Sequence, residues 1–276
     1  AIVNAAEKYV RLANPISPDR SVMRTSLLPS MMEAIERNAR LRDELGFFEI
    51  GPVFLPIDGE VLPKEEIRLA AAMTGKRLAD SWDSHSNAAI DFFDLKGVLE
   101  ALMDGLHLTG LKLTPASHPC LHPGKSADIF LGETRIGVIG ELHPQTAKEY
   151  DLMSGAVVVM ELNLEAVQPL TDANYKVKPI STFPMIYEDI AVVVDEALPV
   201  SDVMDLIRQT GGKQLKRVTL FDIFRSDAIG AGKKSLAFNL AYQSDEKTLT
   251  DKDATAIRSK IVRRLEQVLG AKLRSA

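Results

Sequence analysis

Residues 235–242 read SLAFNLAY and alternate between large apolar side chains and small or polar ones. A period of two is typical of a β-strand with one buried face. The expected core residues are Leu236, Phe238, Leu240 and Tyr242, and the expected outward residues are Ser235, Ala237, Asn239 and Ala241. This strand determines the fold of the last third of the chain, because the flanking elements can be read outward from it.

The elements around this strand predict a small domain of its own. Strands are expected at 190–194 and 215–224, with a helix at 200–209 between them. A capping box of Thr250 and Asp253 begins a second helix, Gly270 ends it, and a short strand follows at 271–274. The order βαββαβ is that of the ferredoxin-like fold. Both helices then cover one face of the sheet, which leaves the other face free to bind a ligand.

The first part of the chain predicts an α+β domain with an antiparallel sheet and flanking helices. Helices are expected from Met31 to Leu45 with Gly46 as the stop, from Asp91 to Leu108, and from Pro144 to about Tyr150. Expected strands are 47–55, 67–73, 129–131, 136–139 and 157–162. From Glu165 to Pro184 the periodic patterns stop in a polar run with three prolines. We therefore predict domains at 1–170 and 182–276, joined by a linker at 171–181.

Composition sets the protein class. The 276 residues carry a formal charge of −5, with 46% hydrophobic and 26% charged residues, which is ordinary for a globular protein. The charge is uneven, at −7 for residues 1–179 and +2 for the rest, a weak indication of a nucleic-acid role for the second part. No apolar run approaches the ~20 residues of a membrane span.

The single cysteine, Cys120, fits the reducing cytoplasm. The opening Ala1-Ile2 suggests a fragment of a longer chain.

Catalytic and metal-binding patterns are weak. His118, Cys120 and His122 form an H-x-C-x-H triplet, with His143 as a possible fourth ligand. All three histidines precede proline, so loop architecture is favoured over a zinc site. The sequence has no G-x-S-x-G, P-loop or G-x-G-x-x-G motif. Residues 1–179 therefore indicate a core without a catalytic constellation, and we expect no metal.

The uncovered face of the small sheet is more informative. If Phe221 and Ile223 point inward, Asp222 and Phe224 point outward together. Ser235 and Ala191 take the outward parity on neighbouring strands. An aromatic ring can stack on a splayed base, while a carboxylate accepts from the N1–H and N2–H₂ of guanine. An ordinary surface with a stray aromatic residue remains the alternative interpretation.

Several ordered motifs resemble one family. Those in the first part are NPIS (14–17), MRTSLLP (23–29), NAR (38–40), FEIGPVF (48–54), DLKG (94–97), HPG (122–124) and GELHP (140–144). Those in the second part are TFP (182–184), LFDIF (220–224) and LGAKLR (269–274). They resemble the C-terminal part of the bacterial phenylalanyl-tRNA synthetase beta subunit. Residues 182–276 resemble its ferredoxin-fold anticodon-binding domain.

The resemblance implies a role for the first domain. It would be a class II synthetase-like module that is not catalytic and packs against the alpha subunit in an alpha2-beta2 heterotetramer. A working class II site carries an ATP-binding arginine after the strand equivalent to 48–54, but here Leu55 follows. The fragment alone is thus expected to be inactive and to hold no cofactor, with ATP and magnesium implied for the holoenzyme.

For the second domain, the family reads the anticodon of tRNA(Phe), whose first base is guanine. The carry-over assigns that base to Asp222 and Phe224, with Ser235 and Ala191 lining the site. One departure is Glu188, where the family often has arginine, so a phosphate contact there is in doubt. Two alternatives remain open: a βαββαβ regulatory amino-acid-binding protein and a complete class II ligase.

Overall fold

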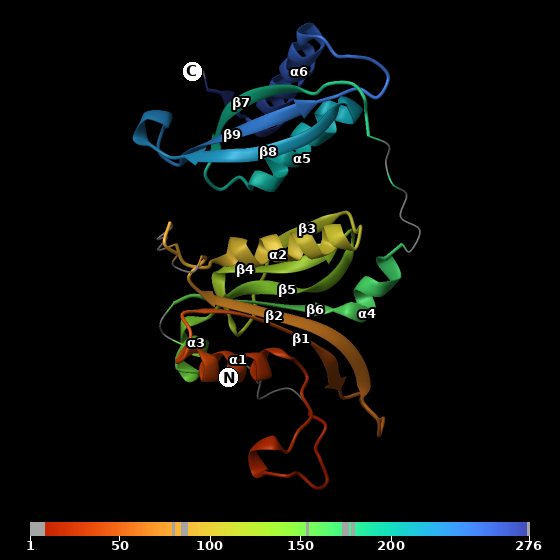
Figure 1. Ribbon diagram of the computed structural model, residues 1–276, viewed down its shortest axis with the longest axis vertical. Helices are drawn as coiled ribbons and strands as arrows, with labels where there is room; N and C mark the ends of the chain where they lie inside the picture. Colours follow the sequence, from red (N-terminus) through yellow and green to blue (C-terminus); the bar gives the residue numbers. More distant parts are fainter. Residues whose placement is uncertain are drawn as a thin grey trace. The chain divides into compact units, whose positions relative to one another are not determined.

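The chain forms two compact units, residues 1–175 and residues 176–276 (Figure 1). The structure is a computed structural model, and it describes residues 9–78, 81–83, 88–152, 155–172, 177 and 180–274. Most of the predicted linker, including Lys176 and Lys178, lies outside the described residues. Within the described residues, no helix is both long and apolar enough to cross a membrane.

The first unit is built on one antiparallel sheet of six strands, in the order β1-β2-β6-β5-β4-β3. Its strands are β1 (Glu44–Leu55), β2 (Lys64–Gly75), β3 (Leu111–Pro115), β4 (Leu121–Leu131), β5 (Thr134–Leu142) and β6 (Val157–Asn163). Its helices are α1 (Leu28–Ala39), α2 (Phe92–Gly105), α3 (Pro144–Glu149) and α4 (Leu164–Val167). The predicted antiparallel α+β architecture is confirmed.

Helices pack on both faces of this sheet (Figure 1). On one face, α1 buries Met32 and Ile35 against Val53 of β1 and Val159 of β6. On the other face, α2 buries an apolar stripe that includes Leu95 and Leu99 against β4, β5 and β6. The sheet is therefore the middle layer of the unit.

Some boundaries differ from the sequence-based expectation. Helix α1 ends at Ala39, and Leu45 belongs to β1, where it pairs with Thr74 of β2. The amides of Leu41 and Arg42 turn back to the carbonyl of Asn38 and end the helix before Gly46 is reached. Strand β3 was not predicted. Helix α4 and a 3₁₀ turn, Gln168–Leu170, form at the start of the run without a periodic pattern, and both precede the predicted linker at 171–181.

The second unit is a four-stranded antiparallel sheet in the order β10-β7-β9-β8. Its elements are β7 (Ile186–Asp195), α5 (Val200–Gly211), β8 (Leu215–Phe224), β9 (Lys233–Tyr242), α6 (Asp251–Leu269) and β10 (Lys272–Leu273). The predicted βαββαβ order is confirmed. The capping box of Thr250 and Asp253 begins α6, and Gly270 ends it in the left-handed conformation, with φ 62°.

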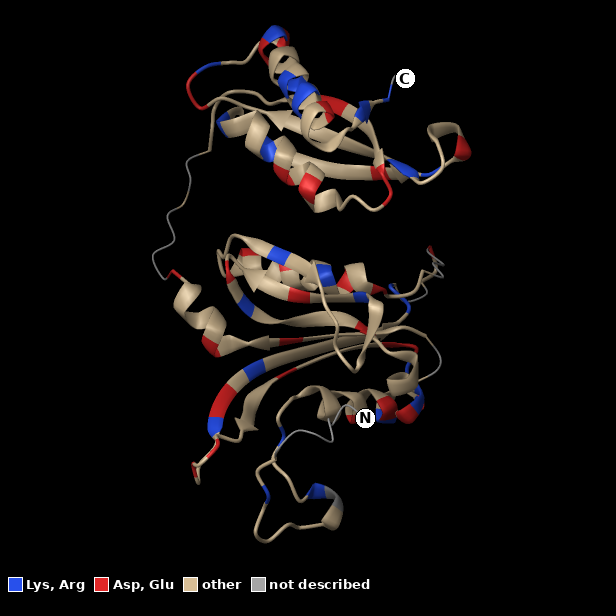
Figure 2. Ribbon diagram, turned by 180° about the vertical axis from the view of Figure 1, so that it is seen from behind, with Lys and Arg blue, Asp and Glu red and all other residues tan. Residues whose placement is uncertain are grey.

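One face of this sheet carries the whole core. Leu236, Phe238, Leu240 and Tyr242 of β9 are fully buried, as the alternation predicted. They form one cluster with Val203 and Ile207 of α5 and with Ile261 and Leu265 of α6. Figure 2 shows the basic residues of α6 along that helix. Because both helices lie on the same face, no described helix of this unit covers the opposite face of the sheet, which is called the open face below.

A β-bulge in β8 corrects one prediction. Leu220 pairs with Phe238 in the core row, but Asp222, not Phe221, pairs with Ala237. Phe221 is the extra residue and is 58% exposed, so the expectation that it points inward is wrong. Ile223 pairs with Leu236 on the core side. Without the bulge, the alternation that buries Val218 and Leu220 would have placed Asp222 on the core side.

Candidate RNA-binding face and polar network

The open face is a grid of four rows, one residue each from β7, β9 and β8. The strand registers give the rows Tyr187–Ala241–Arg217, Asp189–Asn239–Thr219, Ala191–Ala237–Asp222 and Val193–Ser235–Phe224. All four residues predicted for this face, Ala191, Asp222, Phe224 and Ser235, thus lie in two adjacent rows. Antiparallel neighbours in one row have Cβ atoms ~5 Å apart, so these four side chains form one local site.

The centre of this site consists of two small side chains, with an unpaired carboxylate beside them. Ala191 and Ala237 present only methyl groups beside Asp222. The carboxylate of Asp222 is exposed, and within the described residues it makes no hydrogen bond and no ion pair. An unpaired carboxylate keeps its acceptor oxygens available for a ligand.

Phe224 forms one side of the site and is 39% exposed. Arg274 was not predicted as a site residue, but its guanidinium carbon lies 4.8 Å from the centroid of the Phe224 ring. The backbone N–H of Arg274 donates to the carbonyl oxygen of Ala191 at 2.8 Å. Arg274 therefore lies at the edge of the sheet next to β7, and its guanidinium group reaches the ring of Phe224 on β8. The quoted motif LGAKLR contained it, but only the pairing of β10 with β7 puts it beside Phe224.

Ser235 faces this site but is covered. It lies between Val193 and Phe224 in its row and is only 2% exposed. A ligand therefore reaches Ser235 only if its neighbours on this face move aside.

Glu188 lies on the other side of the sheet. It pairs with Leu240 in a core row, and Oγ1 of Thr255 on α6 donates to its Oε1 at 3.5 Å. Burial, together with the Glu188 carboxylate, raises the pKa of the neighbouring Tyr242 hydroxyl. An acid at position 188 therefore changes the charge beneath the helices and not the charge of the open face.

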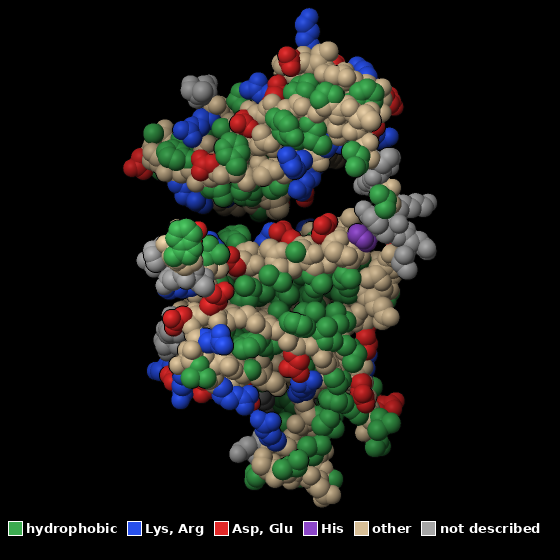
Figure 3. Space-filling model, in the orientation of Figure 1, with side chains coloured by type: hydrophobic (Ala, Val, Ile, Leu, Met, Phe, Trp, Pro, Cys, Tyr) green, Lys and Arg blue, Asp and Glu red, His purple; other side chains and the backbone are tan. Residues whose placement is uncertain are grey.

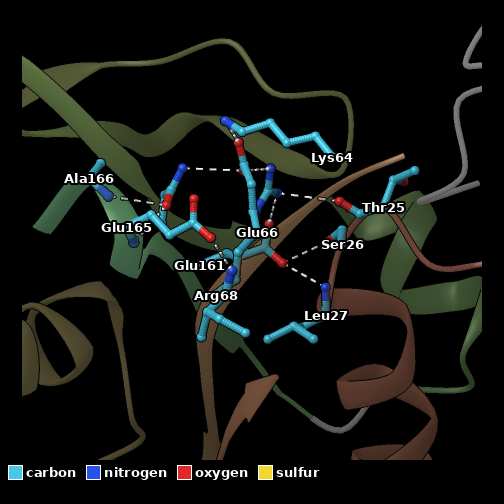
Figure 4. A network of polar contacts seen from close by, with 11 residues as sticks. Thr25, Ser26, Leu27, Lys64, Glu66, Arg68, Glu161, Glu165 and Ala166 are labelled. Atoms are coloured by element: carbon cyan, nitrogen blue, oxygen red, sulfur yellow. Dashed lines mark hydrogen bonds and ion pairs between the residues drawn. The ribbon is translucent and has the colours of Figure 1, made fainter. Parts of the chain in front are cut away.

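The first unit contains a polar network that the sequence reading missed (Figure 4). Glu161 accepts hydrogen bonds from the N–H of Leu27 at 2.6 Å, from Oγ of Ser26 at 2.9 Å and from Nη1 of Arg68 at 2.9 Å. Its carboxylate is 8% exposed. A carboxylate this buried is stable only when it is paired and hydrogen-bonded.

Glu66 extends the same network along β2. It accepts from Nζ of Lys64 at 2.7 Å, from Nη2 of Arg68 at 3.1 Å and from Nδ2 of Asn163 at 3.2 Å. Burial alone would raise the pKa of Glu66, but the bonds from Lys64 and Arg68 outweigh it and hold that pKa below its usual value. Arg68 therefore joins two nearly buried acids and is committed to the protein itself.

Leu55, at the position where a working class II site is expected to carry an arginine, does not fit a phosphate. Leu55 ends β1 opposite Lys64 and packs against the hydrophobic core beside Val53. Val53 pairs with Glu66, so these side chains share the face of the sheet that holds the polar network. A leucine methyl group offers no charge or hydrogen bond to a phosphate, and Arg68 nearby is already held by Glu66 and Glu161.

The histidine-rich loops also have a structural explanation. The Nδ1 atoms of His122 and His143 accept hydrogen bonds from the N–H of Gly124 at 3.1 Å and of Gln145 at 3.2 Å. His143 is the N-cap of α3. Among the residues that the structure describes, no group of three or more His, Cys, Asp or Glu side chains is arranged to hold a metal ion.

Two family models match the chain in order. The model described as phenylalanyl tRNA synthetase beta chain CLM domain matches residues 3–164, and the ferredoxin-fold anticodon binding domain matches residues 181–274. Among solved structures, a pyrrolysyl-tRNA synthetase from Desulfitobacterium hafniense aligns over 59% of this chain and 54% of its own, with 14% identity and a TM-score of 0.44. That likeness is too slight to argue from.

Curated relatives match over nearly the whole chain. Phenylalanine–tRNA ligase beta subunits from Bacillus thuringiensis subsp. konkukian and Geobacillus kaustophilus are 39% and 40% identical over 267 residues, which is 96% of this chain and 33% of each relative. The subunit from Symbiobacterium thermophilum is 39% identical over 273 residues, 97% of this chain and 30% of its own length. This chain therefore spans about a third of these relatives. The chain belongs to the phenylalanyl-tRNA synthetase beta chain family.

Proposed function

We propose that this chain serves a phenylalanine–tRNA ligase by binding the anticodon of tRNA(Phe) through its second unit and an alpha subunit through its first. The observation that carries the proposal is the free carboxylate of Asp222, which lies beside Phe224 over a floor of two alanines on an uncovered sheet. Such a surface suits a single unstacked base, the usual target of sequence-specific RNA recognition.

The chemistry of the site favours guanine. Guanine presents N1–H and N2–H₂ side by side on one edge, and the two oxygens of Asp222 accept from both. Adenine has one donor group on that edge, so it leaves one oxygen of Asp222 without a partner. Phe224 supplies stacking, which is worth ~1–3 kcal/mol per base and is tolerant of base identity. The methyl groups of Ala191 and Ala237 let the base approach the strands, and Ser235 lies beside them in the next row.

The first unit serves assembly rather than chemistry in this proposal. Leu55 stands where a phosphate ligand is needed, and the Glu66–Arg68–Glu161 network fills the same face of the sheet. The chain then needs no cofactor of its own. ATP and magnesium act in the holoenzyme, an alpha2-beta2 heterotetramer in the cytoplasm, where the alpha subunit activates phenylalanine.

Exposed apolar residues support a protein partner for the first unit. Phe48 and Ile50 of β1 are exposed, and so is Ile67 of β2. Phe48 and Ile50 are opposite Ala71 and Leu69, and Ile67 is opposite Pro52, so the three share one face of the β1–β2 pair. Figure 3 shows hydrophobic side chains over much of the face of this unit that is turned to the viewer. A contiguous apolar surface of this kind is typical of a protein interface.

A binding assay tests the function directly. The whole chain is titrated into a labelled RNA hairpin that carries the tRNA(Phe) anticodon loop, with guanine or adenine as the first anticodon base, and the same chain is screened with free amino acids by thermal shift. The proposal predicts RNA binding that is tighter for guanine, and no amino-acid shift. Stabilisation by one amino acid without RNA binding would support the regulatory-domain alternative instead.

A further inference from the structure

A second aromatic–arginine pair lies at the opposite end of the open face from Phe224. Tyr187 on β7 is 54% exposed, and the guanidinium carbon of Arg217 on β8 lies 6.0 Å from the centroid of its ring. Both residues are in register with Ala241 of β9, which is fully buried although it points to the open face. Tyr187 and Arg217 thus close over Ala241 from the two neighbouring strands.

The groups of this pair remain available to a ligand. Arg217 makes no hydrogen bond and no ion pair within the described part of the chain. The hydroxyl of Tyr187 donates to Sδ of Met185 at 3.4 Å, and Arg217 lies over one face of the ring, which is 54% exposed. An exposed ring beside an unpaired guanidinium repeats the arrangement of Phe224 and Arg274.

A continuous path joins the two pairs. Val193, whose row contains Phe224, is six positions after Tyr187 on β7. At the rise of a β-strand, the two residues are about 20 Å apart. The rows between them contain the two alanines and the polar row of Asp189, Asn239 and Thr219, in which Nδ2 of Asn239 donates to Oδ1 of Asp189 at 2.8 Å. At the ~3.4 Å rise of stacked nucleotides that distance corresponds to about six nucleotides, and to fewer in an extended strand.

We propose that Tyr187 and Arg217 form a second RNA subsite, which binds another nucleotide of the same single strand that places its guanine at Asp222. The ring of Tyr187 stacks on the base, and Arg217 stacks beside it or pairs with its phosphate. No carboxylate or amide in the Tyr187 row reads a base edge, so this subsite contributes affinity without base preference. The inference rests on the proposed function, because it extends the same RNA along the same face.

The test uses the whole chain and two fluorescent RNA probes, the tRNA(Phe) anticodon hairpin with guanine or with adenine as the first anticodon base. Tyr187→Ala is expected to weaken binding of both hairpins about 5- to 100-fold, the range for loss of one stacked base. Tyr187→Phe keeps the ring and should restore binding to within about twofold of wild type. Arg217→Ala should weaken binding of both hairpins and lower the slope of log affinity against log salt by about one charge.

Matched controls separate this subsite from general effects. Phe93→Ala removes an exposed aromatic ring from α2 of the first unit, and Arg263→Ala removes an exposed arginine from α6 on the helix side of the sheet. Neither should change RNA affinity by more than about twofold. Thermal unfolding of each variant shows whether the fold is kept, and Tyr187→Phe keeps the test valid if Tyr187→Ala does not fold.

The outcomes distinguish this inference from the proposed function. If Phe224→Ala weakens binding while Tyr187→Ala and Arg217→Ala bind like wild type, the second subsite is wrong and the anticodon site stands. If Tyr187→Ala weakens binding and Phe224→Ala does not, the second subsite stands and the assignment around Asp222 is wrong. If the wild-type chain binds neither hairpin, the proposed function and this inference are both overturned.

Discussion

The guanidinium carbon of Arg274 lies over the ring of Phe224 on β8, 4.8 Å from the ring centroid. The backbone N–H of the same residue donates to the carbonyl oxygen of Ala191 on β7, two strands away from Phe224. One flexible side chain therefore lies across the site that we assign to the first anticodon base. A guanidinium plane can stack on a base and also pair with a phosphate. Arg274 can therefore leave the ring and contact the bound nucleotide from above.

This relationship predicts that Arg274→Ala weakens binding of the anticodon hairpin by about 1–2 kcal/mol, through the loss of one cation–π or phosphate contact. The loss should be the same for guanine and adenine, because Arg274 does not read the base edge. Fluorescence titration at several salt concentrations measures both effects. Arg274→Lys keeps the positive charge but not the planar guanidinium group, so its affinity for the hairpin should lie between those of wild type and Arg274→Ala. Tighter binding by Arg274→Ala would instead show that Arg274 only blocks the ring.

The polar network predicts a pH dependence for the first unit. The folded-state pKa of Glu66 is held low by Lys64 and Arg68, so its stabilising contribution is present above the unfolded value of about 4.3 and is lost as pH falls through the lower folded value. Glu66→Gln should cost about 1–3 kcal/mol at pH 7, because it removes hydrogen bonds to a charged acceptor. Urea unfolding of wild type and Glu66→Gln at pH 7, 5 and 3 should show this difference shrinking toward acid. A difference that stays constant with pH would contradict the assigned role of Glu66.

The division into two units predicts the site of proteolysis. The boundary between the compact units falls at 175/176, and exposed connections between domains are the preferred sites of cleavage. Limited trypsin treatment should cut after Lys176, because Lys178 precedes Pro179 and trypsin does not readily cleave a Lys–Pro bond, and it should release a folded fragment that retains α5 and α6. Mass spectrometry of the early products identifies the cut. Equal resistance along the whole chain would indicate a single fused unit.

Leu55 and the commitment of Arg68 to Glu66 and Glu161 predict that this chain alone makes no aminoacyl-adenylate. Phenylalanine-dependent exchange of pyrophosphate into ATP should stay at background for the purified chain and appear when an alpha subunit is added. Phenylalanine-dependent pyrophosphate exchange by the chain alone would contradict the non-catalytic role of the first unit and favour the complete-ligase alternative.

Strands β8 and β9 differ in how well their sequence pattern predicts which side chains are buried. The alternation of residues 235–242 gave the buried face of β9 correctly, because both its neighbours pair with it without interruption from Phe238 to Leu240. In β8 the prediction that Asp222 and Phe224 point outward is confirmed, but the prediction that Phe221 points inward is wrong. The bulge at Phe221 that turns the strand is a tertiary feature with no local signal in the sequence.

Other features depended on contacts between distant segments. Arg274 reaches Phe224 only because β10 pairs with β7, and Ser26, Arg68 and Glu161 meet from three parts of the chain. The strand expected at 67–73 begins earlier, at Lys64, so the sequence pattern did not place Glu66 in the sheet. The sequence pattern predicts which residue types alternate along one element, whereas burial of an acid depends on which partners the fold brings to it.

In the proposed function, Asp222 reads the first anticodon base while Phe224 stacks on it. Asp222→Asn keeps the size of the side chain but turns one of its two acceptors into a donor, which should cost about 1–3 kcal/mol against guanine, the usual range for a bidentate base contact. Phe224→Ala should lose a similar ~1–3 kcal/mol for either base, and Arg263→Ala should change little.

The most direct measurement is charging efficiency, kcat/KM for tRNA, of the assembled alpha–beta enzyme with guanine or adenine as the first anticodon base. Asp222→Asn should reduce the preference for guanine about 5- to 160-fold, while Phe224→Ala should lower the efficiency with both tRNAs and keep the preference for guanine. A guanine preference left intact by Asp222→Asn would contradict the assignment of the site.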